Sequence, residues 1–379
     1  MRRILWPLYL LISAAALLLF GLLAFAFVYS NYFATYDASL PAYGAQPSAG
    51  SMSWSTDDPD RIRILSIDGG GMFGIAELEV LKGIEDKAGR PIHELFDFVA
   101  GSSTGAIAAS LLLLPDAKTG KPKSAEEAID TYRVLASKVL ERPVSHRLQT
   151  AFGLFGPVFD NRGHVAAAQE AFGDAVFGDL LRPAMMPGFT RNDNSMRFFR
   201  NWEPDNQTLL LSSLVTAVTS AETIFPSTQL VGLDGADAIV SDPGFVLSSP
   251  AHAAYVLARE AQTEVKEIIV VSVSNDFPPL IDDNIQLRGG MVQWFFPLSV
   301  MVFRGERSLV QQALKAHGSY DSEVSVTYFE LVPFIEDAWP FSASAENIDK
   351  IKQAGADYVS KHQNLLGNVV AALEKPTSD

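Results

Sequence analysis

Two short motifs that could form a hydrolytic site lie about 30 residues apart, each between a β-rich run and a helical pattern. The first is a glycine-rich turn over Asp68–Gly74 (DGGGMFG), and the second is Gly101–Gly105 (GSSTG). Successive glycines allow backbone N–H groups to converge on one anion at the start of a helix. A G-x-S-x-G turn between a strand and a helix is typical of a nucleophile elbow, which exposes its serine hydroxyl. The two motifs together predict a nucleophile, Ser103, beside an anion-binding loop.

The elements that must position these motifs follow the pattern of one strand–helix–strand unit. Arg61–Ile67 is a β-rich run that stops at Asp68, and residues 75–84 then have apolar side chains at helical spacing. Phe96–Ala100 is a second apolar run, and residues 106–113 after the serine are strong helix formers. Strands continue to alternate with helices further along the chain. This order predicts an α/β fold with a mostly parallel sheet covered on both faces.

A dinucleotide-binding fold is a rival interpretation of the first glycine loop. Gly69–Gly74 fits G-x-G-x-x-G between a strand and a helix. That fold places an acidic residue at the end of the second strand, whereas Asp97 stands at its start here. A nucleotide-binding function therefore stays open as a weaker alternative.

The amino terminus is a candidate membrane anchor. Met1-Arg2-Arg3 precedes an apolar run from Ile4 to Val28, and roughly 20 such residues suffice to cross a bilayer. Lys and Arg are then absent until Arg61, so the amino terminus is expected in the cytoplasm and the remainder across the membrane, in a periplasm or lumen. The alternative is a cleaved signal peptide with a site near Ala24-Phe25-Ala26. We expect an anchor over residues 1–30, a flexible tether over 31–60 and one catalytic domain over 61–379.

Composition narrows the classes of partner. The 379 residues carry a formal net charge of −15, which argues against nucleic acid and against electrostatic docking on an anionic membrane. The chain has no cysteine, which excludes disulfides, thiol nucleophiles and thiolate metal sites. No His, Asp or Glu cluster has metal-ligand spacing, and Asp282-Asp283 is better explained as a solvated turn. No metal and no cofactor is expected.

The carboxyl-terminal half supplies candidate carboxylates at the ends of predicted strands. Residues 229–233 form a predicted strand that ends at Asp234-Gly235-Ala236, and Asp242-Pro243-Gly244 follows. The apolar run Met291–Phe303 is too short to cross a bilayer; it could line an acyl pocket, touch a membrane face or be ordinary core. Further predicted elements are a capped helix from Ser124 to Leu140, helices over 209–221, 250–261, 345–362 and 365–374, and strands near 196–199, over 267–273 and over 324–332.

With these motifs in this order, the chain resembles the patatin-like phospholipases over about residues 61–375. The resemblance rests on Asp68–Gly74, Gly101–Gly105, Ala221–Pro226, and Asp234–Ala236 with the downstream Asp242-Pro243. It implies a three-layer α/β/α fold and ester hydrolysis of phospholipid or acylglycerol without metal. It also implies a dyad of Ser103 as nucleophile and Asp234 as base. The oxyanion donors it implies are Gly69, Gly70 and Gly71, and the residues that support the motifs are Asp68, Gly74, Gly101, Gly105, Gly235 and Ala236.

Two alternatives concern the chemistry itself. The chain order Ser…Asp…His would permit a histidine triad with His252, His317 or His362. Phe73 stands where the family usually has Lys or Arg, so a membrane-tethered lipid-binding module without catalysis is also open.

Overall fold

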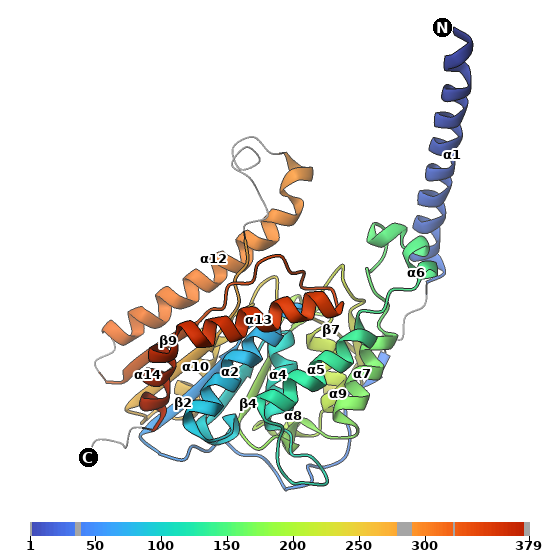
Figure 1. The fold of residues 1–379 in the computed structure, drawn as a ribbon. Coiled ribbons are helices and arrows are strands. Elements are labelled where there is room, and N and C mark those ends of the chain that lie inside the picture. The colour runs from blue at the N-terminus through green and yellow to red at the C-terminus, as the bar shows by residue number, and fades with distance from the viewer. Residues whose placement is uncertain (1, 35–38, 279–289, 321–322, 375–379) are drawn as a thin grey trace.

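A nine-stranded mixed sheet forms the centre of the computed structural model, which describes residues 2–34, 39–278, 290–320 and 323–374 (Figure 1). The strand order is β1-β6-β7-β4-β3-β2-β8-β9, with β5 paired to β4. Pairings that involve β5 or β7 are antiparallel, and the others are parallel. The strands are β1 Ser39–Pro41, β2 Arg61–Ile67, β3 Phe98–Gly101, β4 Ala184–Thr190, β5 Ser195–Arg200, β6 Thr228–Val231, β7 Ala238–Ser241, β8 Glu267–Val273 and β9 Ser325–Leu331.

Helices cover both faces of this sheet, which confirms the three-layer α/β/α prediction. The side chains of β2 point alternately to the two helical layers. Ile62 and Ile64 pack on the face covered by α10 and α12, and Leu65 and Ile67 pack on the other face. That second face is covered by α2, α4, α5, α7, α9, α13 and α14. Every residue of β2 is buried, as expected for a central parallel strand. The helices are α1 Arg2–Tyr32, α2 Gly74–Ala88, α3 Ile92–Leu95, α4 Thr104–Leu113, α5 Ala125–Val139, α6 Val144–Gln149, α7 Arg162–Phe172, α8 Pro204–Gln207, α9 Leu211–Val218, α10 Ala251–Ala261, α12 Met291–Tyr320, α13 Ala345–Lys361 and α14 Gln363–Glu374.

Two strands that the sequence did not predict, β4 and β7, decide the geometry of the site. β4 contains Pro187 and Gly188, residues that ordinarily argue against a central strand. Pro187 lies beyond the last residue of β4 paired to β3 and before the first one paired to β7, so neither ladder needs its missing N–H. β7 is only four residues long, and sequence periodicity is weak at that length.

The helix α1 projects from one corner of the domain (Figure 1). Over Leu11–Tyr32 it has a mean hydropathy of 2.6 and is long and apolar enough to cross a membrane, although a signal sequence has the same properties. Its carboxyl-terminal end rests on α6 and on the segment after it: Ser30 Oγ donates to the Gln149 carbonyl oxygen at 3.5 Å, and the Phe27 and Phe155 rings lie 5.6 Å apart.

Residues 39–60 pack against the domain and do not form the flexible tether that the sequence predicted over 31–60. β1 pairs with β6, and the indole of Trp54 packs against Phe98 and Trp202 with ring centroids 5.3 and 5.0 Å away. The segment is therefore held by backbone pairing and by aromatic contacts that composition alone does not reveal.

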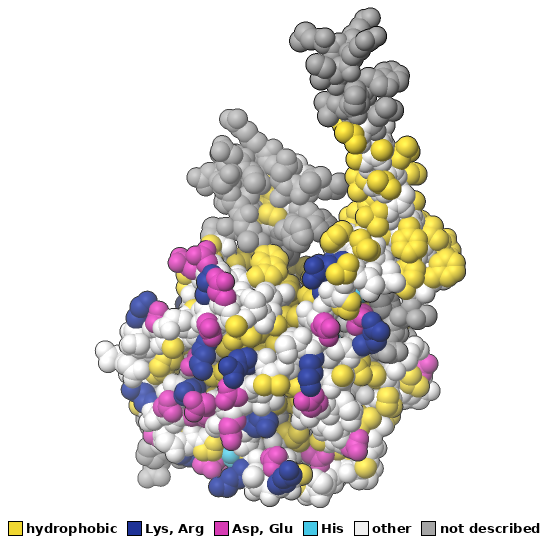
Figure 2. All heavy atoms as spheres, turned by 45° about the vertical axis from the view of Figure 1, so that its right-hand side comes forward, with side chains coloured by type: hydrophobic (Ala, Val, Ile, Leu, Met, Phe, Trp, Pro, Cys, Tyr) yellow, Lys and Arg dark blue, Asp and Glu magenta, His cyan; other side chains and the backbone are white. Residues whose placement is uncertain are grey.

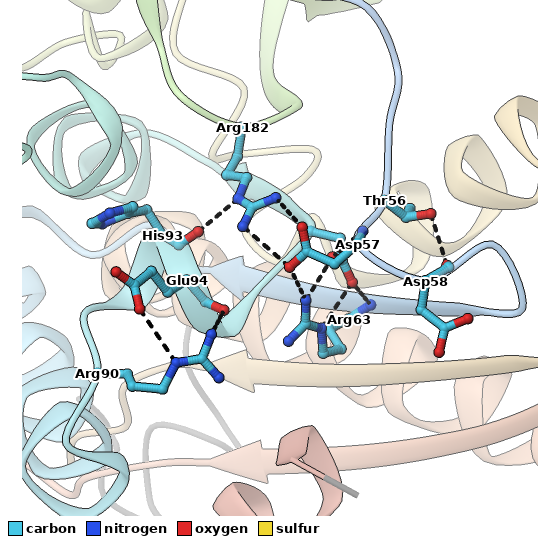
Figure 3. Close-up of polar contacts among 9 residues, drawn as sticks. Thr56, Asp57, Asp58, Arg63, Arg90, His93, Glu94 and Arg182 are labelled. Carbon is cyan, nitrogen blue, oxygen red and sulfur yellow. Dashed lines mark hydrogen bonds and ion pairs between the residues drawn. The ribbon is translucent and has the colours of Figure 1, made fainter. Parts of the chain in front are cut away.

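An ion-pair network fixes the same segment to the amino ends of β2 and β3. Arg63 donates to both carboxylate oxygens of the buried Asp97, at 2.9 and 2.7 Å, and to Asp57 at 2.6 Å. Figure 3 shows Asp57 between Arg63 and Arg182, with the Arg90–Glu94 pair nearby. Because Asp97 is engaged at the amino end of β3, it is not placed to bind the ribose of a dinucleotide.

Replacement of Asp97 by Asn should lower the free energy of unfolding by about 3 kcal/mol, because it removes one partner of a buried ion pair. The matched control is Glu94→Gln, which breaks an exposed pair and should cost less than about 1 kcal/mol. Urea unfolding monitored by tryptophan fluorescence measures both. Equal effects of the two substitutions would contradict the structural role given to Asp97.

Candidate active site

Ser103 sits in a sharp turn between β3 and α4. Its backbone is at φ 50°, ψ −121°, a conformation that costs a non-glycine residue about 1–3 kcal/mol. The flanking glycines permit the turn: a Cβ at Gly101 would lie 2.3 Å from the Gly105 carbonyl oxygen, and one at Gly105 would lie 2.1 Å from that of Ile67. These contacts explain in physical terms why the motif needs glycine at both ends.

The carboxylate that meets Ser103 is Asp242, so the prediction of Asp234 as its partner is wrong. Ser103 Oγ donates a hydrogen bond of 2.5 Å to Asp242 Oδ2, and the Gly244 N–H donates to Asp242 Oδ1 at 2.7 Å. The sheet register explains why the two side chains meet. β3 pairs with the start of β4, where Ala100 lies beside Met185, and β7 pairs with the end of β4, where Ser241 lies beside Phe189. The two strands therefore run toward each other, and each register, continued by one to three residues, brings Ser103 and Asp242 beside Gly188.

Asp234 is engaged elsewhere. It lies in the short turn Leu233–Gly235, its side chain is 52% exposed, and it forms an ion pair with Arg197. The hydrogen bond from Arg197 lowers the pKa of Asp234. Its motif neighbours Gly235 and Ala236 likewise lie outside the cavity at Ser103. The sequence did hold a signal for Asp242, because Ala238–Ser241 is a short apolar run followed directly by Asp-Pro-Gly.

The environment of Asp242 changes its acidity. Burial raises its pKa to about 7, and the negative charge of Glu222 acts in the same direction, while the hydrogen bonds from Ser103 and Gly244 oppose the rise. Ser241 Oγ donates to Glu222 at 2.7 Å, so this second carboxylate is fixed at the end of the same strand. A carboxylate with a pKa near neutrality is a better proton acceptor than an ordinary Asp.

The glycine loop lies against the serine, and its three predicted donors differ. A Cβ on Gly69 would be 3.1 Å from Ser103 Cβ, but the Gly69 N–H already donates to the Ser248 carbonyl oxygen at 3.0 Å. Gly69 is therefore not placed as an oxyanion donor here. Over the described part of the chain, the N–H groups of Gly70 and Gly71 have no backbone acceptor, which leaves both as candidates.

The other residues of this motif support the loop. Asn275 Nδ2 donates to the Gly69 carbonyl oxygen at 3.1 Å and to Glu77 Oε1 at 2.6 Å. Asp68 is buried behind the loop, and burial raises its pKa to about 8. Gly74 begins α2, where a Cβ would be in ordinary contact with Thr104.

A cavity of about 500 Å³ opens beside Ser103 and Asp242. One wall is apolar and comes from α5, α7 and α9; it includes Ala136, Ala168, Phe172 and Val215. On the other side Val300, Phe303, Arg304 and Arg307 of α12 contribute, so part of the apolar run predicted over Met291–Phe303 does line the pocket.

Basic side chains reach the cavity although Phe73 replaces the usual Lys or Arg. The Phe73 ring is buried with its centroid 5.6 Å from that of Phe277, and the Arg304 guanidinium lies 5.8 Å from the Phe277 centroid. Arg307 donates to the Asn275 carbonyl oxygen at 2.8 Å. These guanidinium groups come from a helix more than 200 residues away in sequence, so no local motif could indicate them, and both pair with Asp276, which also lines the cavity.

None of the three histidines proposed for a triad lines the cavity in the described residues. The Nε2 atoms of His252 and His317 face each other at 3.3 Å between α10 and α12, and His362 stacks on Tyr358. His164 does line the cavity, but its ring pairs with Thr219 Oγ1 at 2.8 Å, and burial lowers its pKa to about 4. Within the ranges that the structure describes, no three His, Asp or Glu side chains group so as to hold a metal; Asp282 and Asp283 lie outside those ranges.

The chain is similar in sequence to a known protein family. The family model for patatin-like phospholipase matches residues 65–255, about half of the chain, from β2 through α10. The chain belongs to the patatin-like phospholipase family. The matched range contains Ser103, Asp242 and the glycine loop of the patatin-like domain.

Individual relatives match over shorter ranges. Phospholipase A I of Arabidopsis thaliana is 55% identical over 51 residues, 14% of this chain and 4% of that protein. Human calcium-independent phospholipase A2-gamma is 41% identical over 83 residues, 22% of this chain and 10% of that protein. Patatin-like protein 2 of A. thaliana is 27% identical over 183 residues, 44% of each. The chain thus spans less than half the length of these curated relatives.

Among solved structures, VipD from Legionella pneumophila covers 89% of this chain and 72% of its own, with 12% identity and a TM-score of 0.40.

The raised pKa of Asp242 predicts a distinctive pH dependence of stability. A proton on this buried group stabilises the fold fully below about pH 4, and that contribution is lost as the pH rises through about 7. The Asp242→Asn variant should therefore gain stability relative to wild type over this interval, by at most ~4 kcal/mol.

Urea unfolding between pH 4 and pH 8 measures the difference. Asp234→Asn is the matched control, because Arg197 lowers the pKa of that carboxyl and its contribution to stability is lost only as the pH falls below about 4. The difference in stability between wild type and this variant should therefore stay nearly constant from pH 4 to pH 8. A wild-type-minus-Asp242→Asn difference that does not change with pH would contradict the buried, proton-binding state of Asp242.

Proposed function

We propose that this protein is a membrane-anchored lipid acyl hydrolase that cleaves carboxylic esters with a Ser103–Asp242 dyad. The observation that carries the proposal is the 2.5 Å hydrogen bond from Ser103 Oγ to a buried carboxylate at the floor of a largely apolar cavity. Membership of a phospholipase family supports a lipid ester as the substrate.

In the proposed reaction Asp242 accepts the hydroxyl proton while Ser103 Oγ attacks the ester carbonyl carbon. The N–H groups of Gly70 and Gly71 would donate to the oxyanion of the tetrahedral intermediate, an interaction worth roughly 3–4 kcal/mol for one donor. Collapse of the intermediate breaks the ester bond, and the departing alkoxide takes the proton from Asp242. Water then attacks the acyl-enzyme, again with Asp242 as base, and releases a fatty acid and free Ser103.

The cavity supports a substrate with a long acyl chain and an anionic head group. Its apolar wall from α5, α7 and α9 would hold the chain, and a phosphate would share the guanidinium groups of Arg304 and Arg307 with their partner Asp276. A phospholipid meets both requirements.

Anchoring through α1 is the second part of the proposal. Its apolar length suits a membrane span, and Arg2 and Arg3 favour a cytoplasmic amino terminus with the catalytic domain on the other side. Secretion after signal-peptide cleavage is the alternative; the mass of the mature protein distinguishes the two.

The dyad is tested by single substitutions. Ser103→Ala and Asp242→Asn should each lower kcat/KM for a chromogenic acyl ester by about 10⁴-fold, since each removes a group that takes part in proton transfer or attack. Asp234→Asn is the matched control and should stay within about twofold of wild type.

Labelling by a fluorophosphonate separates catalysis from mere lipid binding. Wild type should be labelled, and Ser103→Ala should not. Failure of the wild-type protein to react would favour the lipid-binding module, and loss of activity in Asp234→Asn with retention in Asp242→Asn would reverse the assignment of the base.

The acyl wall is tested by filling it. Ala168 on α7 is buried and lines the cavity, so Ala168→Leu should lower kcat/KM for long-chain esters by about tenfold and leave butyrate esters nearly unchanged. Ala166→Leu on the exposed side of the same helix is the control. An equal effect of Ala168→Leu on both chain lengths would remove this wall from the acyl site.

A further inference from the structure

We propose that the mouth of the cavity is pressed against the lipid bilayer by an apolar rim, so that substrate enters directly from the membrane. The inference rests on the proposed function and on the retention of α1. The rim consists of Phe152, Leu154, Phe245, Val246, Met301 and Trp339.

The rim residues are exposed, and four of them line the cavity or adjoin its lining residues in the chain. Their six side chains are between 45% and 66% exposed. Val246 and Met301 directly follow Phe245 and Val300, which line the cavity. Phe245 and Trp339 also line the cavity, and the Phe245 ring stacks on Phe303 of α12 at 5.8 Å. The apolar wall of the cavity is therefore continuous with apolar surface outside it.

The position of α1 indicates that a bilayer is the partner. The end of α1 contacts the segment at 149–155, which contains Phe152 and Leu154. About 20 residues cross a ~30 Å hydrocarbon core, so a span formed by the apolar run that ends at Val28 brings the membrane boundary down to this corner. In Figure 2 the apolar side chains of α1 continue into apolar side chains at its base, with basic side chains beside them.

The cavity lies close to the segment on which α1 rests, because the Val158 N–H donates at 2.9 Å to the carbonyl oxygen of Thr223, which lines the cavity. Figure 1 shows α1 and the first turns of α12 projecting from the same side of the domain. Met301 of α12 is 54% exposed there. A membrane placed around α1 therefore meets the α12 part of the rim as well.

Backbone strain supports a role for the exposed Phe152. This residue and Ala151 have φ of 60° and 45°, conformations that cost side-chain-bearing residues about 1–3 kcal/mol each. Apolar contact with a membrane interface stabilises an exposed phenylalanine and would offset this cost.

The charge of the protein also favours apolar contact with the membrane. The net charge of −15 gives the protein no electrostatic attraction to anionic lipid, so apolar contact must supply the binding energy.

The experiment uses the absence of cysteine, because any single introduced thiol can be labelled selectively. Leu154→Cys and Met301→Cys, in the full chain reconstituted in phosphatidylcholine vesicles, carry an environment-sensitive fluorophore; Leu181→Cys, before the amino end of β4, is the control. Doxyl-labelled lipids should quench the probe at 154 and 301 at least about twofold and leave the probe at 181 unchanged. No quenching at 301, or equal quenching at all three positions, would overturn the proposal.

Kinetics give a second test that separates this inference from the proposed chemistry. The Leu154→Glu/Met301→Glu variant should turn over vesicle phosphatidylcholine about tenfold more slowly and a soluble butyrate ester at the wild-type rate. Leu181→Glu is the matched control and should alter neither rate. Unchanged turnover of vesicle lipid by the double variant would overturn the docking surface. If wild type hydrolyses neither ester, the proposed function fails, and the quenching experiment still decides the docking.

Discussion

The hydrogen bond between Ser103 and Asp242 is the interaction on which the rest of the site depends. It exists because β3 and β7 run toward each other along β4, so that a serine and a carboxylate from distant parts of the chain meet near Gly188. Each partner alone is destabilising: Ser103 has a strained backbone conformation, and Asp242 is a carboxylate buried away from water. The packing of the sheet keeps both residues in these positions, and the serine hydroxyl therefore points at a base.

Burial of acidic groups extends behind the glycine loop. Asp68 and Glu77 are both buried, and desolvation raises the pKa of each; their mutual repulsion raises that of Glu77 further. Asn275 connects Glu77 to the Gly69 carbonyl, so this layer fixes the loop that faces Ser103. Buried polar groups thus hold the glycine loop in place, and apolar side chains line the cavity that the loop faces. Because water is excluded from such a site, electrostatic interactions within it are stronger than in solution.

The same architecture separates the two ends of the domain. Ion pairs such as Arg63–Asp97 lie at the amino ends of the central strands, while the serine turn and the cavity beside it lie at the carboxyl end of β3. Arg304 and Arg307 enter the cavity from α12 and bring basic groups to a site whose glycine loop carries Phe73. The cavity thus has charged groups, including the Asp276 that pairs with both arginines, as well as apolar lining.

The sequence by itself determined the local parts of this protein: β2, the glycine loop, the serine turn with its two obligatory glycines, the capped α5 and the apolar α1. Each depends on residues close together in the chain, where periodicity and steric rules act directly. It did not identify the strands β4 and β7, and for that reason it selected Asp234 over Asp242 as the partner of Ser103. Both aspartates follow short apolar runs, and the resemblance of Asp234-Gly235-Ala236 to the family motif favoured the wrong one. Only the pairing of β3 and β7 with β4 decided between them, because hydrogen bonds between distant strands fix which side chains face one another. The packing of residues 39–60 and the entry of arginines from α12 were decided in the same way.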